Sequence, residues 1–265
     1  MRALSLAVIA CCASSYALSC RSVTDAGATP RMHGPMPAAP APAKVEHAPA
    51  PVEHAPAAPA GPPRAQLEPI APSALCVSSG TISSAGARRL HVDAGGMRGV
   101  IAHDRSRSAE LAFTYRGAST STAPLADGEL RRQIGLKLRA QDTCNVVYVM
   151  WHIEPSPGIF VLVKHNAGKS THSECGDGGY VVLKSDFTAT APLIQRGAPS
   201  VLRADIEGTE LRVSADGVDV WRGRLPREAF SFDGPVGVRT DNGAFDFELR
   251  VPGGRTSGGS CPRPD

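Results

Sequence analysis

The stretch Asn145–Ile153, NVVYVMWHI, limits the folds open to this chain more than any other feature. Alternate residues of a strand point to opposite faces. One face of this stretch would carry Val147, Val149, Trp151 and Ile153, and the other Val146, Tyr148, Met150 and His152. A strand that is apolar on both faces belongs in the middle of a sheet and not at its edge. We therefore expect an interior β-strand here.

The 265 residues divide by composition. More than half of the 23 prolines lie between Pro30 and Pro72, whereas every aromatic residue except Tyr16 lies between Phe113 and Phe247. We therefore predict a signal peptide over residues 1–19, an Ala/Pro-rich disordered tether over 20–72 and one folded domain over 73–265. On folding, a domain of that size buries roughly 70% of the surface that its unfolded chain exposes, which is enough for one core.

The N-terminus predicts export. Met1-Arg2 is followed by an apolar stretch, Ala3–Ala17, which is too short to span a membrane and is typical of a secretory signal. Ala17-Leu18-Ser19-Cys20 resembles a bacterial lipobox imperfectly, so Cys20 is the candidate for lipidation and for a lipid anchor in the cell envelope, outer membrane or periplasmic. The alternative is cleavage after Ala17, which gives a soluble secreted protein. An odd thiol in an exported chain favours lipidation.

The tether is repetitive and rich in proline. The heptad Val45–Pro51 is followed directly by a near copy, Val52–Ala58. Repeated prolines favour an extended polyproline II chain, and ~50 residues at ~3.1 Å each would reach on the order of 150 Å. Such a tether suits a domain that is held away from a membrane.

The remaining sequence alternates with a period of two, between turns, and contains no helical segment of useful length. Besides the interior strand, we expect strands over Glu110–Arg116, Arg131–Ala140, Gly158–His165, Gly179–Lys184, Val201–Ile206, Leu211–Ala215, Val218–Arg222, Val236–Thr240 and Ala244–Val251. The stretch Gly158–His165 should pair with the interior strand, because Pro155–Gly158 forms a turn between them. The fold class is therefore all-β.

The last fifty residues carry a resemblance. A strand over Val201–Ile206 turns into Leu211–Ala215, the Asp216-Gly217 turn leads to a short strand with Trp221, and GPVGVR (234–239) precedes a final amphipathic strand. This order resembles the C-terminal half of concanavalin A-like jelly rolls, including laminin-G-like modules and the domain of the 3-keto-disaccharide hydrolase family. The resemblance implies two stacked antiparallel sheets, one of them with a concave face that holds sugar in many relatives.

The four cysteines of the domain allow three disulfide pairings. The first and last strands of a jelly roll lie side by side, so the resemblance implies a Cys76–Cys261 bond, which leaves Cys144 with Cys175. A zinc site at His165, His172 and Cys175 is the alternative for the second pair, although an oxidising compartment favours a disulfide.

Enzymatic motifs are incomplete. Asp205 and Glu207 match two carboxylates of the Glu-x-Asp-x-Glu strand of jelly-roll glucanases, but Arg203 stands where the nucleophile would be. Gln133-Ile134-Gly135 resembles the Gln-Ile-His of alginate lyases without its histidine. His91 or His103 with Asp104 and Ser106 has no recognisable triad spacing. The sequence therefore favours a protein that is not an enzyme.

The polar face of the predicted sheet supplies the candidate ligand-binding residues. If Ile134, Leu136 and Leu138 face the core, the residues that alternate with them point outward. The matching face of the interior strand then points outward too. These residues, with one from the following strand, are Gln133, Lys137, Arg139, Tyr148, His152 and Lys164. Either a loop covers this face or it is a groove for a glycan or peptide, and its positive charge would favour an acidic glycan.

The leading hypothesis is a non-catalytic module, anchored or secreted, that binds carbohydrate or cell-wall polysaccharide. The alternatives are a glycoside hydrolase or polysaccharide lyase with an atypical site on the same face, and a structural or protein-binding envelope protein. A formal net charge of +3 without a basic block argues against nucleic acid as a partner. No cofactor is predicted. Asp233, Asp241 and Asn242 are the turn residues that could hold calcium.

Overall fold

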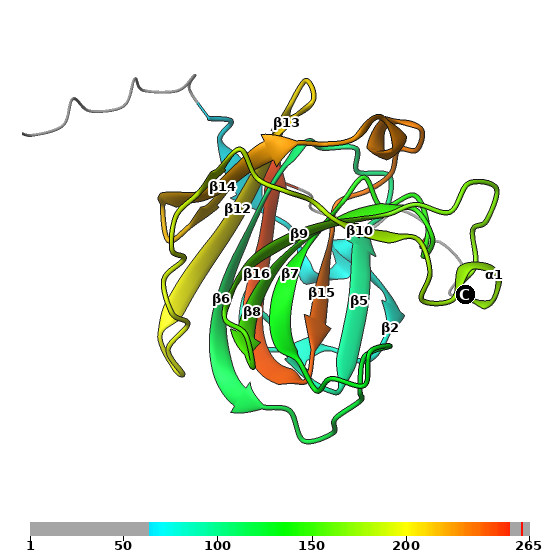
Figure 1. Cartoon of the computed structure of the whole chain (residues 1–265). Coiled ribbons are helices and arrows are strands. Elements are labelled where there is room, and N and C mark those ends of the chain that lie inside the picture. Colours follow the sequence, from blue (N-terminus) through cyan, green and yellow to red (C-terminus); the bar gives the residue numbers. More distant parts are fainter. Residues whose placement is uncertain (1–63, 255–260, 262–265) are drawn as a thin grey trace, which may run out of the picture. The chain divides into compact units, whose positions relative to one another are not determined.

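The computed structural model describes residues 64–254 and residue 261. They form two antiparallel sheets packed face to face (Figure 1). The two-sheet jelly-roll sandwich expected from the sequence is confirmed. The predicted signal peptide, Cys20 and most of the tether lie outside the described residues, and no helix within the described part of the chain is long and apolar enough to cross a membrane.

In the nine-stranded sheet, eight strands follow one another in a single order, and β1 lies off this order and pairs with β16. In space, the order runs through β11 (Phe187–Thr188), β14 (Val218–Arg224), β13 (Glu210–Ala215), β12 (Pro199–Glu207), β6 (Ser108–Ala118), β16 (Gly243–Pro252), β4 (Leu90–Asp93) and β3 (Ser83–Ser84). Because β1 (Leu67–Pro69) pairs with β16, the sandwich begins N-terminal to residue 73.

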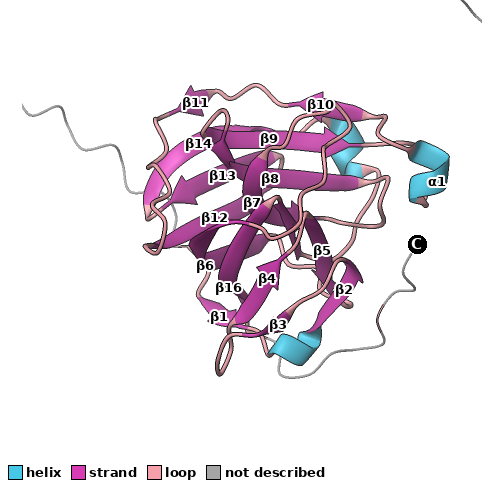
Figure 2. Ribbon diagram, turned by 90° about the horizontal axis from the view of Figure 1, so that it is seen from below, coloured by secondary structure: helices cyan, strands magenta, loops and turns pink. Residues whose placement is uncertain are grey.

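The seven-stranded sheet forms the other layer. Its spatial order is β10 (Tyr180–Val182), β9 (Gly158–Lys164), β8 (Val146–Glu154), β7 (Arg132–Leu138), β15 (Gly237–Asp241), β5 (Gly96–Ile101) and β2 (Leu75–Ser79). The strand β8 is interior and pairs with β9, as the sequence predicts. The strands β10 and β11 are the edge strands of the two sheets and lie along the same border of the sandwich (Figure 2).

Within residues 64–254, three short elements are helical. These are the 3-10 turns η1 (Pro72–Ala74) and η2 (Arg227–Phe230) and the four-residue helix α1 (His172–Cys175). The predicted Asp216-Gly217 hairpin turn is present between β13 and β14, and both of its residues have positive φ, 48° and 82°. A two-residue turn with positive φ at both positions matches the right-handed twist of the flanking strands.

The core lies between the two sheets and is built from the inward-facing residues of both. Phe113 on β6 contacts Trp151 on β8 edge-to-face, with 5.7 Å between the ring centroids. Such aromatic pairs add about 0.5–1.5 kcal/mol beyond the area that they bury. The inward face of β8, Val147, Val149 and Trp151, is at most 1% exposed. The sequence pattern thus sets which face of β8 enters the core and leaves the other face for the site described below.

Both implied disulfides are confirmed. Cys76 bonds to Cys261 with 5.4 Å between the Cα atoms, and Cys144 bonds to Cys175 with 5.8 Å. Cys76 lies within β2. Its side chain belongs to the small cluster of buried residues on the outer face of the seven-stranded sheet, together with Val100 and Tyr148.

Candidate functional site

The outer face of the seven-stranded sheet, which points away from the core, gathers five of the six predicted ligand-binding residues. Ile134, Leu136 and Leu138 of β7 face the core, so the residues between them face outward. Directly opposite on β8, Gln133 pairs with His152 and Lys137 with Tyr148. Lys164 closes β9 beside Val146. The structure therefore brings Gln133, Lys137, Tyr148, His152 and Lys164 onto one surface.

Arg139 has a different role. It follows β7 with a positive φ of 51°, which breaks the alternation of the strand. Its guanidinium donates to the backbone oxygens of Ala229 (3.0 Å) and Phe232 (2.5 Å) and lies 3.2 Å from the Asp233 carboxylate. Arg139 therefore holds the η2 segment in place and does not join the other five residues.

Three residues that the sequence analysis did not select complete the surface. Arg98 on β5 and Arg239 on β15 are direct cross-strand partners, and Tyr180 on β10 pairs with Lys164. Alternation in the GVRTD sequence of β15 would have placed Arg239 and Asp241 on one face. The sequence of β15 alone does not show that Arg239 and Asp241 lie near β8, because the order of strands in a sheet depends on pairings along the whole chain.

The centre of this surface is an aromatic and cationic cluster, which we define as Arg98, Lys137, Tyr148, Lys164, Tyr180 and Arg239. The rings of Tyr148 and Tyr180 are stacked, with centroids 6.2 Å apart. The Arg239 guanidinium lies 5.0 Å from the centre of the Tyr148 ring, and the Lys164 ammonium lies 5.1 Å from that of Tyr180. Both distances are within the range of cation–π attraction.

Gly135 makes room for the contact between Arg239 and Tyr148. The strand β7 separates β15 from β8, and Gly135 is the direct partner of both Arg239 and Met150. A Cβ atom at Gly135 would lie 2.2 Å from the Val149 carbonyl oxygen and 2.7 Å from the Met150 sulfur. Since no side chain stands there, the guanidinium can reach across β7 to the tyrosine ring.

Asp241 orients one side of the cluster. Its carboxylate accepts hydrogen bonds from Arg98 (2.7 Å), Arg239 (2.8 Å) and the Gln133 amide (2.6 Å), and it is 1% exposed. Because a carboxylate only accepts, the Gln133 amide must turn its nitrogen toward Asp241. The Gln133 oxygen is then left without a partner among the described residues, as is Nδ1 of His152 on the neighbouring strand.

Accessibility divides the cluster into two levels. Tyr148 is 5% exposed and Lys164 2%, whereas Tyr180 is 38% exposed and the Arg98 side chain 26%. The Tyr180 ring and the Arg98 guanidinium are therefore the parts that a ligand could touch directly. Tyr148 and Lys164 form the layer beneath them.

The electrostatic potential of the cluster is positive. Burial acts to raise the pKa of Tyr148, but Arg239, Lys137, Arg98 and Lys164 together outweigh it, and the pKa lies below the ordinary value of 10.0. Burial lowers the pKa of Lys164. For His152, burial first and then Arg131 and Arg239 lower the pKa from 6.5 to about 3, so this imidazole is neutral at physiological pH.

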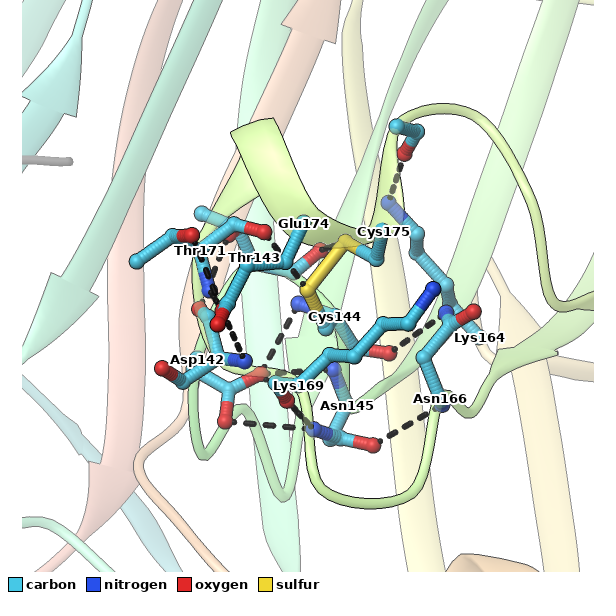
Figure 3. Close-up of a disulfide and its surroundings, with 12 residues drawn as sticks. Asp142, Thr143, Cys144, Asn145, Lys164, Asn166, Lys169, Thr171, Glu174 and Cys175 are labelled. Atoms are coloured by element: carbon cyan, nitrogen blue, oxygen red, sulfur yellow. Dashed lines mark hydrogen bonds between the residues drawn. A yellow bond between two sulfur atoms is a disulfide. The ribbon is translucent and has the colours of Figure 1, made fainter.

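The segment after β9 fixes the position of Lys164 (Figure 3). Lys164 donates to the Gly176 carbonyl oxygen at 2.7 Å. The Asp142 carboxylate caps the turn before β8 by accepting from the backbone nitrogens of Cys144 and Asn145, each at 2.8 Å. The Cys144–Cys175 bond then ties this turn to α1. A covalent bond and buried polar contacts thus support this end of the surface.

The metal alternatives do not fit the described residues. Cys175 is in a disulfide and is therefore not a thiolate ligand, and His165 contacts the Ser231 hydroxyl at 3.2 Å. Of the candidate calcium ligands, Asp233 is paired with Arg105 and Arg139, and the Asn242 amide bonds to Ala123 and Arg131. Residues 64–254 and 261 contain no group of three or more His, Cys, Asp or Glu side chains that could hold a metal ion.

A cavity of about 320 Å³ adjoins the cluster at the β2 and β5 side of the sheet. Its apolar wall is formed by Cys76, Val100, Ala102, Ala140 and Pro235, and the charged residues Lys137, Arg105, Asp104 and Asp142 also line it. Lys137 therefore belongs both to the cluster and to the cavity. A ligand that lies across the sheet could place one end in this cavity.

The residues of the incomplete enzymatic motifs have structural partners. Asp205 is held by Arg203 through two hydrogen bonds of 2.9 and 3.0 Å on the outer face of the nine-stranded sheet, which is the opposite side of the sandwich from the cluster. Asp104 accepts from the backbone nitrogen (2.7 Å) and the hydroxyl (3.0 Å) of Ser106. Asp205 is therefore paired with a cation, and Asp104 stabilises a local turn two residues long.

Comparison with known proteins finds no matching family model and no matching curated protein. Similar solved structures include the carbohydrate-binding module CBM66 from Bacillus subtilis, with 14% identity, coverage of 66% of this chain and 92% of that chain, and a TM-score of 0.46. Domain 4 of AbnA, a GH43 extracellular arabinanase from Geobacillus stearothermophilus, solved with arabinotriose, has 10% identity, coverages of 67% and 82%, and a TM-score of 0.39. The galectin LEC-6 from Caenorhabditis elegans has 8% identity, coverages of 58% and 87%, and a TM-score of 0.33. We infer no ligand from these similarities.

Proposed function

We propose that this protein binds carbohydrate on the outer face of the seven-stranded sheet. The observation that carries the proposal is the half-exposed Tyr180 ring, stacked on Tyr148 and bordered by the guanidinium of Arg98. A sugar combines apolar C–H faces with hydroxyl groups, so it suits a surface that offers an aromatic ring next to hydrogen-bond donors. The adjoining 320 Å³ cavity is large enough for part of such a ligand.

Binding without catalysis is the simpler form of this function. None of the six residues of the cluster is a carboxylate, and Asp241, the carboxylate beside them, is paired with both Arg98 and Arg239. General acid–base cleavage of a glycosidic bond needs two carboxyl groups on either side of that bond. Chromatography of each bound glycan after prolonged incubation with the protein would reveal a hydrolase or lyase by its products.

The test is a glycan array followed by calorimetry on the oligosaccharides that bind. Tyr180→Ala should weaken their binding by roughly 1–3 kcal/mol, the loss expected for an exposed aromatic anchor. Phe187→Ala is the matched control, because Phe187 is 43% exposed on β11, the edge strand of the other sheet. If no glycan binds, or if Tyr180→Ala binds as well as the wild type, the proposed site is wrong.

We also propose that the protein is exported and that Cys20 carries a lipid anchor. Two disulfides in one domain support an oxidising compartment. Labelling with a palmitate analogue should mark the wild type and not Cys20→Ser. A soluble, unlabelled product that begins near residue 18 would show secretion in place of anchoring.

A further inference from the structure

We propose that the ligand is an acidic glycan, whose carboxylate or sulfate groups supply the counter-charge for the cluster. This inference rests on the carbohydrate binding proposed above and specifies the class of carbohydrate. It follows from a comparison of the charges on the two outer faces of the sandwich.

The outer face of the nine-stranded sheet shows how this protein pairs charges where no ligand is proposed. Arg203 pairs with Asp205, Arg212 with Asp219, Arg250 with Glu110 and Glu248, and Arg116 with Asp246. Each of these arginines has a carboxylate on the same or a neighbouring strand, as expected for a face that is stable on its own.

The outer face of the seven-stranded sheet is not balanced in this way. Its seven strands contain two acidic residues, Glu154 at the end of β8, which pairs with Arg132, and Asp241 on β15. Arg98 and Arg239 are direct cross-strand partners and share the Asp241 carboxylate. Like charges directly opposite each other destabilise a sheet. One carboxylate between two guanidinium groups leaves this part of the surface with net positive charge.

Lys164 provides the second observation. It is 2% exposed, and its ammonium donates to the Gly176 carbonyl oxygen and lies over the Tyr180 ring. Burial lowers the pKa of this ammonium, and the attraction of the Asp177 and Asp142 carboxylates only partly offsets that effect. Burying a cation without a counter-ion costs several kcal/mol, so proteins usually pair it. An anion bound next to the Tyr180 ring would provide the missing charge.

Unused hydrogen-bond donors show where the acidic group would bind. A guanidinium has five N–H donors. Arg98 directs three contacts to the Met97 oxygen (3.1 Å), the Thr240 oxygen (2.9 Å) and Asp241. With a quarter of its side chain exposed, Arg98 can offer its remaining donors to a carboxylate or sulfate while the sugar ring stacks on Tyr180.

The lowered pKa of Tyr148 agrees with this picture. The four cations lower it although the ring is buried, which means that the position of its hydroxyl favours negative charge. The same potential favours the acidic group of a ligand. The positive charge is held by backbone contacts and by the disulfide-linked segment, so it is in place before the ligand arrives.

The experiment compares glycans that differ only in charge. Oligogalacturonate and oligoguluronate are measured against their carboxyl-reduced forms, and heparin and dermatan sulfate oligosaccharides against forms that are desulfated, N-acetylated and carboxyl-reduced, and are therefore neutral. We expect an acidic member of one of these pairs to bind at least about tenfold more tightly than its neutral counterpart, and added sodium chloride to weaken that binding.

Arg98→Gln supplies the variant for the same experiment. It should remove most of the preference for the acidic form and weaken binding of the neutral form much less than that of the acidic form, whereas Arg224→Gln, an exposed position on β14, should change neither. Because the wild-type comparison needs no variant, a misfolded Arg98→Gln would not block the test.

The outcomes separate the two proposals. Equal or tighter binding of the neutral forms would overturn the acidic class and leave carbohydrate binding intact. Acidic preference that persists in folded Arg98→Gln would overturn the placement at this cluster. Absence of binding to every glycan of the array and of these pairs would overturn both proposals.

Discussion

The guanidinium of Arg239 lies 5.0 Å from the centre of the Tyr148 ring and joins β15 to β8 across the strand between them. This contact couples the charge of the site to a group with its own spectroscopic signal, since a phenolate absorbs where a phenol does not. The ionisation of Tyr148 therefore reports on the potential at the proposed site.

The first prediction concerns that ionisation. The pKa of Tyr148 lies below 10.0, whereas burial raises the pKa values of Tyr115 and Tyr180 above it. The difference between wild type and Tyr148→Phe in a spectrophotometric pH titration should therefore show an early phenolate transition. Arg239→Gln should move that transition to higher pH, because the largest of the cationic contributions is removed while the burial of the ring remains. An early transition that persists in Tyr148→Phe would contradict the assignment.

The second prediction concerns stability. Tyr148 is 5% exposed and in contact with Tyr180 and Arg239, so Tyr148→Ala should lower the free energy of unfolding by roughly 3–5 kcal/mol, as for other large buried rings. Tyr180→Ala, at the partly exposed edge, should cost only about 1 kcal/mol. Chemical denaturation of both variants measures this difference. Equal losses would mean that the two rings are equally buried in solution.

The fold could be predicted from the sequence where residues alternate over a long strand. The stretches that become β6, β7, β8, β12 and β16 have seven to eleven residues with an apolar face, and each was expected within a few residues of its observed bounds. The strands at the start of the domain were not expected. They are short, from two to six residues, and β5 contains two glycines, so their pattern is too brief to separate from a loop.

The candidate site could be predicted only in part, because a face is a property of several strands. Alternation within β7 and β8 was sufficient to place Gln133, Lys137, Tyr148 and His152 together. It was not sufficient for Arg139, whose backbone leaves the β conformation. Nor was it sufficient for Arg239 on β15, which lies beside β7, and Arg98 on β5, one strand further, because these positions depend on the order of strands in the sheet. The burial of Tyr148 could not be predicted either, since it depends on the contacts of its ring with Tyr180 and Arg239.

The third prediction concerns acid. His152 has a pKa of about 3 in the native protein and 6.5 as its ordinary value. Between these values the unfolded chain takes up a proton that the native state does not, so stability falls as the pH decreases from about 6.5 to about 3. Above 6.5 the residue is neutral in both states and has no effect.

His152→Gln should make the free energy of unfolding less dependent on pH over that interval, because the unfolded chain then takes up to one proton fewer. Leu193→Gln, at a position that is 65% exposed and has no titratable group, is the control and should leave the dependence as in the wild type. Denaturant unfolding at a series of pH values measures both. If the two variants behave alike, His152 is charged in the native protein and its stacking on Phe160 at 3.9 Å does not exclude the proton.

The last prediction compares the two disulfides. The Cys76–Cys261 bond joins residues 185 positions apart, and the Cys144–Cys175 bond joins residues 31 apart. In the chain-entropy model a longer closed loop restricts the unfolded chain more, so the two bonds contribute roughly 5 and roughly 4 kcal/mol. The double variant Cys76→Ser and Cys261→Ser should therefore unfold at a lower denaturant concentration than Cys144→Ser and Cys175→Ser.

The shorter disulfide should matter more for the site than for stability. It ties the turn before β8 to α1, next to the Gly176 oxygen that holds Lys164. Loss of this bond should weaken glycan binding in the folded variant, whereas loss of the longer bond should act mainly on unfolding. Calorimetry at a temperature where both variants are folded distinguishes the two effects, and equal binding by both would mean that Lys164 keeps its position without the disulfide.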